Sequence, residues 1–317
     1  MNQRSLGESG IRVSAVALGT WAMGGDVAVW GHIDDRESIA AIQQALDCGI
    51  NLIDTAPIYG NGHAEEIVGK AVSGRRNEVV IATKCGLVPP DRDGDLPIRN
   101  LSAKQIHREC EASLRRLRVD AIDIYHCHWP DPETPVRETM EALVTLWDQG
   151  KIRAIGLSNF GCERLAAARE FGPIHCLQPP FSMLNRRAAD DLLPYCKEHQ
   201  IGVICYGPLA KGLLTGKFHR DAKFNDLRSQ DADFQGVRYY RNLDIVDELK
   251  KVAIKYDKTV GQLAINWAAS FPGIAAPIFG AKRPSQVREN VGGIGWEISR
   301  EDRDLIDRIL GGPPGAI

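Results

Sequence analysis

Short apolar runs alternate with longer amphipathic runs along most of this chain. Eight short runs predict strands, and most are almost continuously apolar, which is typical of a parallel sheet covered on both faces. Between them, apolar residues recur at helical spacing. The predicted strands cover residues 14–19, 51–56, 78–83, 121–128, 153–158, 175–178, 202–207 and 275–280, and the predicted helices cover 36–48, 64–72, 103–117, 136–149, 163–170, 187–199, 243–271 (as two helices) and 284–291.

Eight strands alternating with helices predict an α/β fold, a (β/α)8 TIM barrel. A doubly wound open sheet shows the same alternation and is the alternative that the pattern leaves open. A small hairpin at residues 4–6 and 12–14 and a last helix at 299–310 lie outside the repeat. No linker rich in Pro, Gly or Ser divides the chain, so we expect residues 1–317 to form a single domain.

Three connections, at residues 20–35, 85–100 and 209–240, are too long for simple turns. Each of them follows a predicted strand. In a barrel they would rise from the rim at which enzymes of this fold carry their chemistry. Surface insertions without a function are the alternative, but the shared position favours an active site.

Composition excludes several classes of protein. The 39 Lys and Arg residues against 41 Asp and Glu residues give a charge of −2, without the basic surplus of a nucleic-acid binder. No apolar run reaches the ~18 residues of a membrane span, and the first residues lack the apolar core of a secretory signal. Eight cysteines without a C-x-x-C pair indicate reduced thiols. We expect a cytoplasmic protein, monomeric by default, with no nucleic-acid or membrane partner.

Polar side chains at the predicted strand ends suggest proton-transfer chemistry. Asp54 ends the second strand and leads to Tyr59, Lys84 ends the third, and His128 ends the fourth. A tyrosine has a pKa of ~10, and a neighbouring ammonium lowers it. A carboxylate keeps that ammonium charged despite burial, and a histidine can orient a substrate oxygen. We expect these four side chains to converge at one rim.

His126 competes with His128, because residues i and i+2 on a strand share a face. If His128 reaches the rim, His126 lies one layer deeper, as a hydrogen-bonded interior histidine. The pair also raises a zinc alternative, typical of metal-dependent barrel hydrolases. Such sites need ligands from other strands, and the first and fifth strands end in Gly-Thr and Ser-Asn. We therefore expect no metal.

Phosphate binding is expected after the eighth strand. The segment 60–65 begins like a dinucleotide fingerprint, but Glu65 stands where the third glycine belongs, so we reject that interpretation. After the eighth strand, Gly280 precedes Lys282, Arg283 and a helix start, which together favour an anion. A capped helix with solvated cations is the alternative.

The chain resembles the aldo-keto reductase family, in the bacterial branch of sugar, inositol and general carbonyl metabolism. The resemblance runs nearly end to end. It rests on the segments Gly19-Thr20-Trp21, Asn51-Leu52-Ile53-Asp54-Thr55-Ala56 with Tyr59-Gly60, Glu65-Glu66-Ile67-Val68-Gly69, Thr83-Lys84, His128-Trp129-Pro130, Gly156-Leu157-Ser158-Asn159-Phe160 and Lys211-Gly212-Leu213-Leu214-Thr215-Gly216-Lys217. It implies a barrel in which Asp54, Tyr59, Lys84 and His128 are the catalytic residues. Tyr59 would be the general acid while a nicotinamide delivers hydride.

The resemblance also implies the cofactor site, with NADP as cofactor and NADPH preferred over NADH because a basic pair suits the 2′-phosphate. Ser158, Asn159 and Gln178 would bind the carboxamide and Tyr206 would stack on the ring. The other implied cofactor residues are Gly19, Thr20, Trp21, Asp54, Gly207, Pro208, Leu209, Gly212, Lys217, Arg228, Gly280, Lys282, Arg283, Gln286 and Asn290. The chain departs from many relatives at Gly207, Phe279 and Gln286.

Trp21, Trp30, Tyr59 and Trp129 are expected to wall an aromatic pocket for an aldehyde, a ketone or a sugar-related carbonyl. Potassium-channel β-subunits share the expected fold, so a non-catalytic nicotinamide-binding subunit is a further alternative. The complete set of four catalytic residues favours an enzyme.

Overall fold

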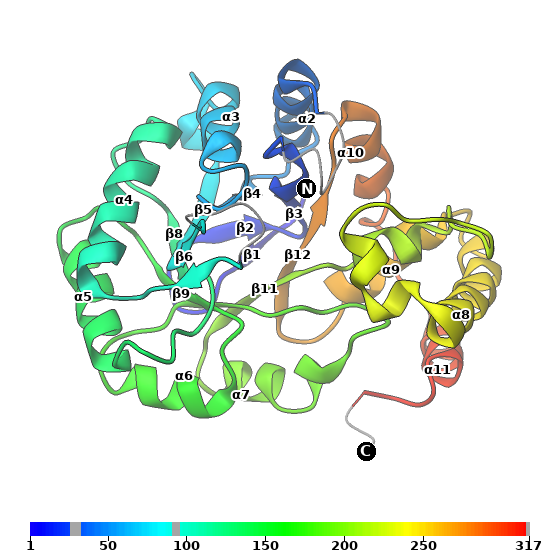
Figure 1. Ribbon diagram of the computed structural model, residues 1–317. Coiled ribbons are helices and arrows are strands. Elements are labelled where there is room, and N and C mark those ends of the chain that lie inside the picture. Colours follow the sequence, from blue (N-terminus) through cyan, green and yellow to red (C-terminus); the bar gives the residue numbers. More distant parts are fainter. Residues whose placement is uncertain (26–32, 91–95, 315–317) are drawn as a thin grey trace.

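The computed structural model describes residues 1–25, 33–90 and 96–314. Eight parallel strands form a closed barrel in the order β10-β11-β12-β3-β4-β5-β8-β9, surrounded by helices (Figure 1). The predicted TIM barrel is confirmed, and the open sheet is excluded because the strands close on themselves. The barrel strands are β3 (Ala17–Gly19), β4 (Leu52–Asp54), β5 (Val80–Cys85), β8 (Ile124–Cys127), β9 (Ile155–Ser158), β10 (Cys176–Gln178), β11 (Gly202–Tyr206) and β12 (Ile274–Gly280).

Helices follow the strands as the periodicity predicts, with local differences. The predicted helix at 187–199 splits into a 3-10 turn (Arg187–Ala189) and α7, because the Asp191 carboxylate accepts the Leu192 backbone N–H at 2.6 Å and caps a new helix. The helices are α2 (Asp35–Asp47), α3 (His63–Ala71), α4 (Ala103–Leu117), α5 (Val136–Asp148), α6 (Cys162–Arg169), α7 (Leu192–Glu198), α8 (Gly236–Ile254), α9 (Val260–Ala269), α10 (Pro284–Val291) and α11 (Arg300–Ile309).

The long connections contain structure of their own. The connection after β5 forms a small hairpin, β6 (Leu87–Val88) and β7 (Ile98–Arg99). The connection after β11 contains three 3-10 turns (Ala210–Thr215, Leu227–Gln230 and Ala232–Phe234), and α8 begins seven residues earlier than predicted. Tyr239 in its first turns is buried against Phe234, which extends the helix toward its N-terminus.

Alternate residues of each strand face opposite sides, and both sides are buried. Leu18, Ile53 and Tyr125 belong to the large cluster beneath the helices. Ala17, Leu52 and Ile124, one residue earlier in each case, belong to a smaller cluster inside the barrel. Burial of both faces explains why the strand sequences are almost continuously apolar.

The N-terminal hairpin closes one end of the barrel. Its strands β1 (Gln3–Ser5) and β2 (Arg12–Ser14) pair antiparallel. Leu6 and Val13 are fully buried in the interior cluster. Gly7 has φ +53°, and a Cβ there would lie 2.3 Å from the Gln200 carbonyl oxygen, so only glycine allows this approach. With this end plugged, the carboxyl ends of the strands are the accessible mouth. No helix in the described ranges is long and apolar enough to cross a bilayer.

His126 lies in the barrel interior beside Lys84 and Gly156 in the strand register, as the alternation predicts. The expectation that it is hydrogen-bonded is wrong, because neither ring nitrogen has a hydrogen-bond partner among the described residues. Burial lowers the pKa of His126 to about 3, and Lys84 adds to this, so the ring is neutral. A Cβ at position 156 would lie 2.3 Å from the imidazole, so Gly156 makes room for the ring.

We predict that Gly156→Ala lowers the free energy of unfolding by about 1–3 kcal/mol, because the added methyl group overlaps the His126 ring. Urea denaturation measures this change. In the double variant with His126→Ala the overlap disappears, so the two losses should be less than additive. Strictly additive losses would contradict this packing.

Candidate active site

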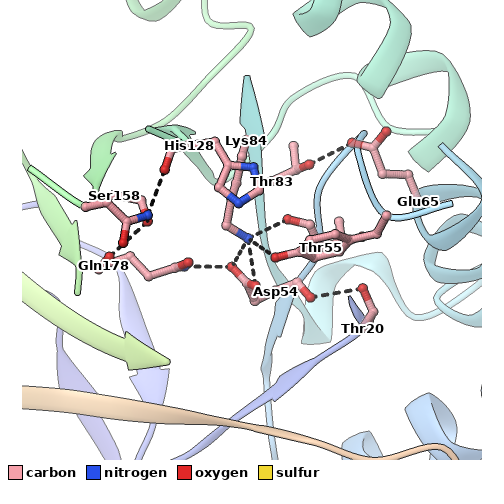
Figure 2. A network of polar contacts seen from close by, with 11 residues as sticks. Thr20, Asp54, Thr55, Glu65, Thr83, Lys84, His128, Ser158 and Gln178 are labelled. Carbon is pink, nitrogen blue, oxygen red and sulfur yellow. Dashed lines mark hydrogen bonds and ion pairs between the residues drawn. The ribbon is translucent and has the colours of Figure 1, made fainter. Parts of the chain in front are cut away.

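Lys84 is the centre of a buried polar network at the carboxyl ends of β4 and β5 (Figure 2). Its Nζ donates to Asp54 Oδ1 at 2.9 Å and Oδ2 at 2.8 Å, and to the Thr55 carbonyl at 2.9 Å. The same nitrogen lies 3.3 Å from the Tyr59 hydroxyl. The structure therefore brings together three of the four predicted catalytic side chains around one ammonium.

Tyr59 lies on the turn between β4 and α3, and close backbone packing fixes this turn. Gly60 has φ +62°, and a Cβ there would lie 1.7 Å from the Gly24 carbonyl oxygen. The segment before Gly24 carries Trp21, whose ring centroid is 6.3 Å from that of Tyr59. The phenol is thereby held between the turn that follows β3 and Lys84.

The electrostatics of Tyr59 differ in part from the prediction. Burial is the largest influence and raises its pKa, Lys84 lowers it, and Asp54 raises it again. Lys84 lowers the pKa of Tyr59, as predicted. The prediction that the pKa is lowered overall is wrong, because the effect of burial outweighs that of Lys84. Burial also acts to lower the pKa of Lys84, but Asp54 and Tyr59 outweigh burial and raise it. At neutral pH the phenol is therefore protonated and the ammonium charged.

His128 completes the group. Its ring meets that of Tyr59 edge-on, with centroids 5.9 Å apart. Its backbone N–H donates to the Cys85 carbonyl at 2.9 Å. Burial first, then Lys84 and His126, hold the pKa of His128 well below its usual range. The imidazole is therefore neutral, suited to orienting a substrate by hydrogen bonding rather than to carrying a proton.

The residues expected to bind a carboxamide adjoin this network. Gln178 donates to Asp54 Oδ1 at 2.7 Å, and the Ser158 hydroxyl donates to the Gln178 carbonyl at 2.9 Å. The Asn159 amide donates to the His128 carbonyl at 2.9 Å and to Ser158 Oγ at 3.1 Å, and its oxygen accepts from the Tyr206 hydroxyl at 2.8 Å. Asn159 has φ +64°, in the left-handed region. These amide groups line the rim beside Lys84.

The first strand contributes backbone to the same rim. Gly19 pairs with Asp54 in the strand register. The backbone N–H and the hydroxyl of Thr20 donate to the Asp54 carbonyl at 2.9 and 3.1 Å. Both residues thus help to hold Asp54 in place.

Cations gather beyond the ends of β11 and β12. Burial lowers the pKa of Lys217, and Arg228 lowers it further. Burial likewise lowers the pKa of Lys282, followed by Arg228, Lys217 and Arg283. Arg228 pairs with Asp226 and packs over Phe218. Lys217, Arg228 and Lys282 thus outnumber the neighbouring carboxylate of Asp226. A cluster with such a surplus of positive charge suits a multiply charged anion such as a pyrophosphate.

The backbone around these cations also suits such a ligand. A Cβ at Gly207 or Gly280 would meet no heavy atom within 4 Å, so both residues face open space. Pro208 and Leu209 continue from Gly207, and the next turn holds Gly212 at φ +97°. The residues present therefore fit a dinucleotide lying across the carboxyl rim.

The start of α10 is more structured than the sequence indicates. Gln286 Oε1 accepts the Lys282 backbone N–H at 2.7 Å, which fixes the loop after β12. Arg283 lies 3.5 Å from Glu37 on the surface, and the Asn290 amide is 3.5 Å from the Gly280 carbonyl. Lys282 and Arg283 thus stand at the N-terminus of α10, where an anion is stabilised.

Of the aromatic residues expected to wall a substrate pocket, Trp21 and Tyr59 lie beside each other. Trp21 stands beside Tyr59 with 43% of its surface exposed. Trp129 follows His128, and the Arg99 guanidinium lies 5.1 Å above its ring. Trp30 falls outside the described residues. Arg99 belongs to β7, and no motif in the sequence singles it out.

The zinc alternative requires further ligands beside His126 and His128. Across residues 1–25, 33–90 and 96–314, no three His, Cys, Asp or Glu side chains group together in a way that would hold a metal ion.

Comparison with known proteins identifies the class. The model of the Aldo/keto reductase family matches residues 15–310. The chain is 42% identical over 315 residues to the Bacillus subtilis (strain 168) aldo-keto reductase YhdN, covering 98% of this chain and 94% of the relative. The chain therefore belongs to the Aldo/keto reductase family, as the sequence resemblance indicates.

Two further relatives are similar over nearly their whole length. The NADH-specific methylglyoxal reductase of Escherichia coli (strain K12) is 38% identical over 317 residues, covering 96% of this chain and 97% of the relative. The solved structure of the glycerol dehydrogenase AKR11B4 from Gluconobacter oxydans superposes with a TM-score of 0.90 at 42% identity, covering 97% of this chain and 94% of that one.

We predict that the His126 and His128 side chains remain neutral at mildly acidic pH, where an exposed histidine is protonated, because burial and Lys84 depress the pKa of both. Long-range ¹⁵N–¹H NMR of protein labelled at histidine measures the charge of each ring. Loss of one signal in His126→Asn or His128→Asn assigns the spectrum. Protonation of either ring near pH 6.5 would contradict the described burial.

Proposed function

We propose that this protein is an NADP-dependent reductase of small aldehydes, ketones or sugar-related carbonyls, which also oxidises the corresponding alcohols. The observation that carries the proposal is the Lys84 ammonium, which contacts the Asp54 carboxylate and the Tyr59 hydroxyl together inside the barrel mouth. The family uses a nicotinamide cofactor. The two named activities among the relatives, methylglyoxal reductase and glycerol dehydrogenase, support small oxygenated substrates.

The four catalytic residues have distinct proposed roles. Bound NADPH would supply the hydride that reduces the carbonyl carbon. Tyr59, protonated at neutral pH, gives its proton to the carbonyl oxygen. The Lys84 ammonium stabilises the phenolate that remains, and Asp54 keeps Lys84 charged and in place. His128, as a neutral imidazole, hydrogen-bonds the substrate oxygen and directs it toward Tyr59.

The remaining residues would bind the cofactor and the substrate. Ser158, Asn159 and Gln178 would hold the nicotinamide carboxamide, and Tyr206 would lie against its ring. The cations beyond β11 and β12 would hold the pyrophosphate and the 2′-phosphate. Because the Escherichia coli relative is NADH-specific by name, the NADP preference rests on Lys282 and Arg283 of this chain. Trp21 and Trp129 wall the substrate side.

The protein is proposed to act in the cytoplasm on small molecules, without a nucleic-acid or membrane partner. All eight cysteines are free thiols, as expected in a reducing compartment.

The first test is an activity assay. Binding of NADPH is followed by quenching of protein fluorescence, and its consumption is followed with aldehydes, ketones and keto sugars. The reverse reaction is assayed with polyols and inositols. We expect binding and turnover. Binding without turnover would favour a regulatory subunit, and the absence of binding would refute the proposal.

We predict that Tyr59→Phe lowers kcat for carbonyl reduction by about 10²–10⁴-fold, because the general acid is lost. NADPH affinity should stay within about twofold. In the wild type, the rate should be level across neutral pH and fall only in strongly alkaline solution, because burial raises the pKa of Tyr59. Near-normal turnover of the variant would refute the role of Tyr59.

We predict that replacing Lys282 and Arg283 together by Ala weakens NADPH binding by at least about tenfold more than NADH binding, because only NADPH carries the 2′-phosphate. Fluorescence titration with both cofactors measures the two affinities. Equal losses would contradict the NADP preference.

A further inference from the structure

The spacing of Tyr59 and Lys84 depends on two separate segments. Tyr59 lies on the turn before α3, whereas Lys84 lies on β5. The direct contact between them, at 3.3 Å, is longer than the contacts of Lys84 with Asp54 and with the Thr55 carbonyl. Small movements of α3 relative to β5 would therefore change this contact first.

Glu65 and Arg116 form an ion pair next to the strand that carries Lys84. Glu65, in the first turn of α3, is fully buried. Its Oε1 accepts the Thr83 hydroxyl at 2.7 Å, and Thr83 immediately precedes Lys84 (Figure 2). Its Oε2 accepts from Arg116 Nε at 2.7 Å and Nη2 at 2.6 Å, near the end of α4. One carboxylate thus joins α3, β5 and α4.

Two glycines allow these segments to meet. Gly62, with φ +96°, lies three residues after Tyr59, and a Cβ there would be 2.6 Å from Arg116 Cδ. A Cβ at Gly69 would lie 2.6 Å from the Arg116 carbonyl oxygen. Larger residues at either position would push α3 and its preceding turn away from Arg116. The two glycines therefore let α3 approach Arg116 closely enough for the ion pair to form.

We propose that Glu65, held by Arg116 and Thr83, is a positioning residue that sets the distance between the Tyr59 hydroxyl and the Lys84 ammonium. Glu65 is the residue that interrupts the glycine fingerprint of segment 60–65, and this inference gives it a function. A carboxylate is required because it accepts from the hydroxyl and the guanidinium at the same time with charge-assisted bonds. The inference rests on the proposed role of Tyr59.

The chain contains a matched control at the other end of the same strand. Asp123 is also a buried carboxylate, and its Oδ2 accepts from the Ile81 backbone at 2.8 Å and from Arg76 at 2.7 Å. Its other oxygen lies 3.0 Å from Arg153. Ile81 stands near the start of β5, away from Lys84. Asp123→Asn therefore weakens a similar ion pair without touching the contact between Tyr59 and Lys84.

The experiment compares Glu65→Gln, Thr83→Val, Thr83→Ser and Asp123→Asn. Thermal unfolding and cofactor titration establish that each variant is folded and binds NADPH. The pH profile of kcat for carbonyl reduction is then measured. Within the part of the chain that the structure describes, Asp54, Lys84, His128 and Tyr206 are the polar and titratable groups that face Tyr59, and all four remain present.

For Glu65→Gln and Thr83→Val we expect kcat to fall about tenfold with an unchanged KM for the carbonyl, because a misplaced proton donor slows only the chemical step. The alkaline limit of kcat should move up by about one pH unit, because Lys84 stabilises the phenolate less at a greater distance. Thr83→Ser, which keeps the hydroxyl, and Asp123→Asn should retain the wild-type profile.

An unchanged pH profile of kcat in Glu65→Gln would overturn the inference. An equal shift of the alkaline limit in Asp123→Asn would overturn it too. If Glu65→Gln does not fold, the comparison of Thr83→Val with Thr83→Ser decides the question. Failure of the proposed function is separately visible, because Tyr59→Phe would then keep an alkaline limit like that of the wild type.

Discussion

The buried charge of Lys84 is the constraint on which the rest of the site depends. An ammonium inside a barrel is strongly destabilising unless it is paired and hydrogen-bonded. Asp54 supplies the counter-charge, and the Thr55 carbonyl accepts a further hydrogen bond. Gln178 at the end of β10 and Thr20 just after β3 then hold Asp54. The polar layer at the barrel mouth follows from the need to stabilise this single charge.

The apolar interior of the barrel below this polar layer influences the charge states of the residues at the mouth. Leu6 and Val13 are fully buried and close the far end of the barrel. His126 and Gly156 occupy the layer beside Lys84, and the neutral His126 ring adds no second charge there. In such surroundings burial is the largest influence on the pKa values of Tyr59 and His128. It raises the first and lowers the second, which leaves the phenol protonated and the imidazole neutral. With these charge states, Tyr59 is proposed to act as the acid and His128 to orient the substrate by hydrogen bonding.

The site has two halves with different physical character. Around Lys84, each charge is matched and buried. Beyond β11 and β12, burial and then Arg228 disfavour the charges of Lys217 and Lys282, and Asp226 lies among these cations. A dinucleotide that spans both halves would meet amide groups at one end and positive charge at the other, which suits the carboxamide and the phosphates of a nicotinamide dinucleotide.

Much of this architecture was predictable because it is encoded in neighbouring residues. The strand and helix periods favour a (β/α)8 barrel, with an open sheet as the alternative that shares them, and the strand ends carry Asp54, Lys84 and His128 in recognisable segments. Two features depend on contacts that no local pattern specifies: the fit of Gly156 to His126 and the position of Arg99 over Trp129. The same is true of Glu65, whose partner Arg116 is 51 residues away. Sequence by itself determined which chemical groups are present and on which elements they lie. Tertiary structure alone decided their charge states and spacing, because burial and long-range packing exist only once the barrel has closed.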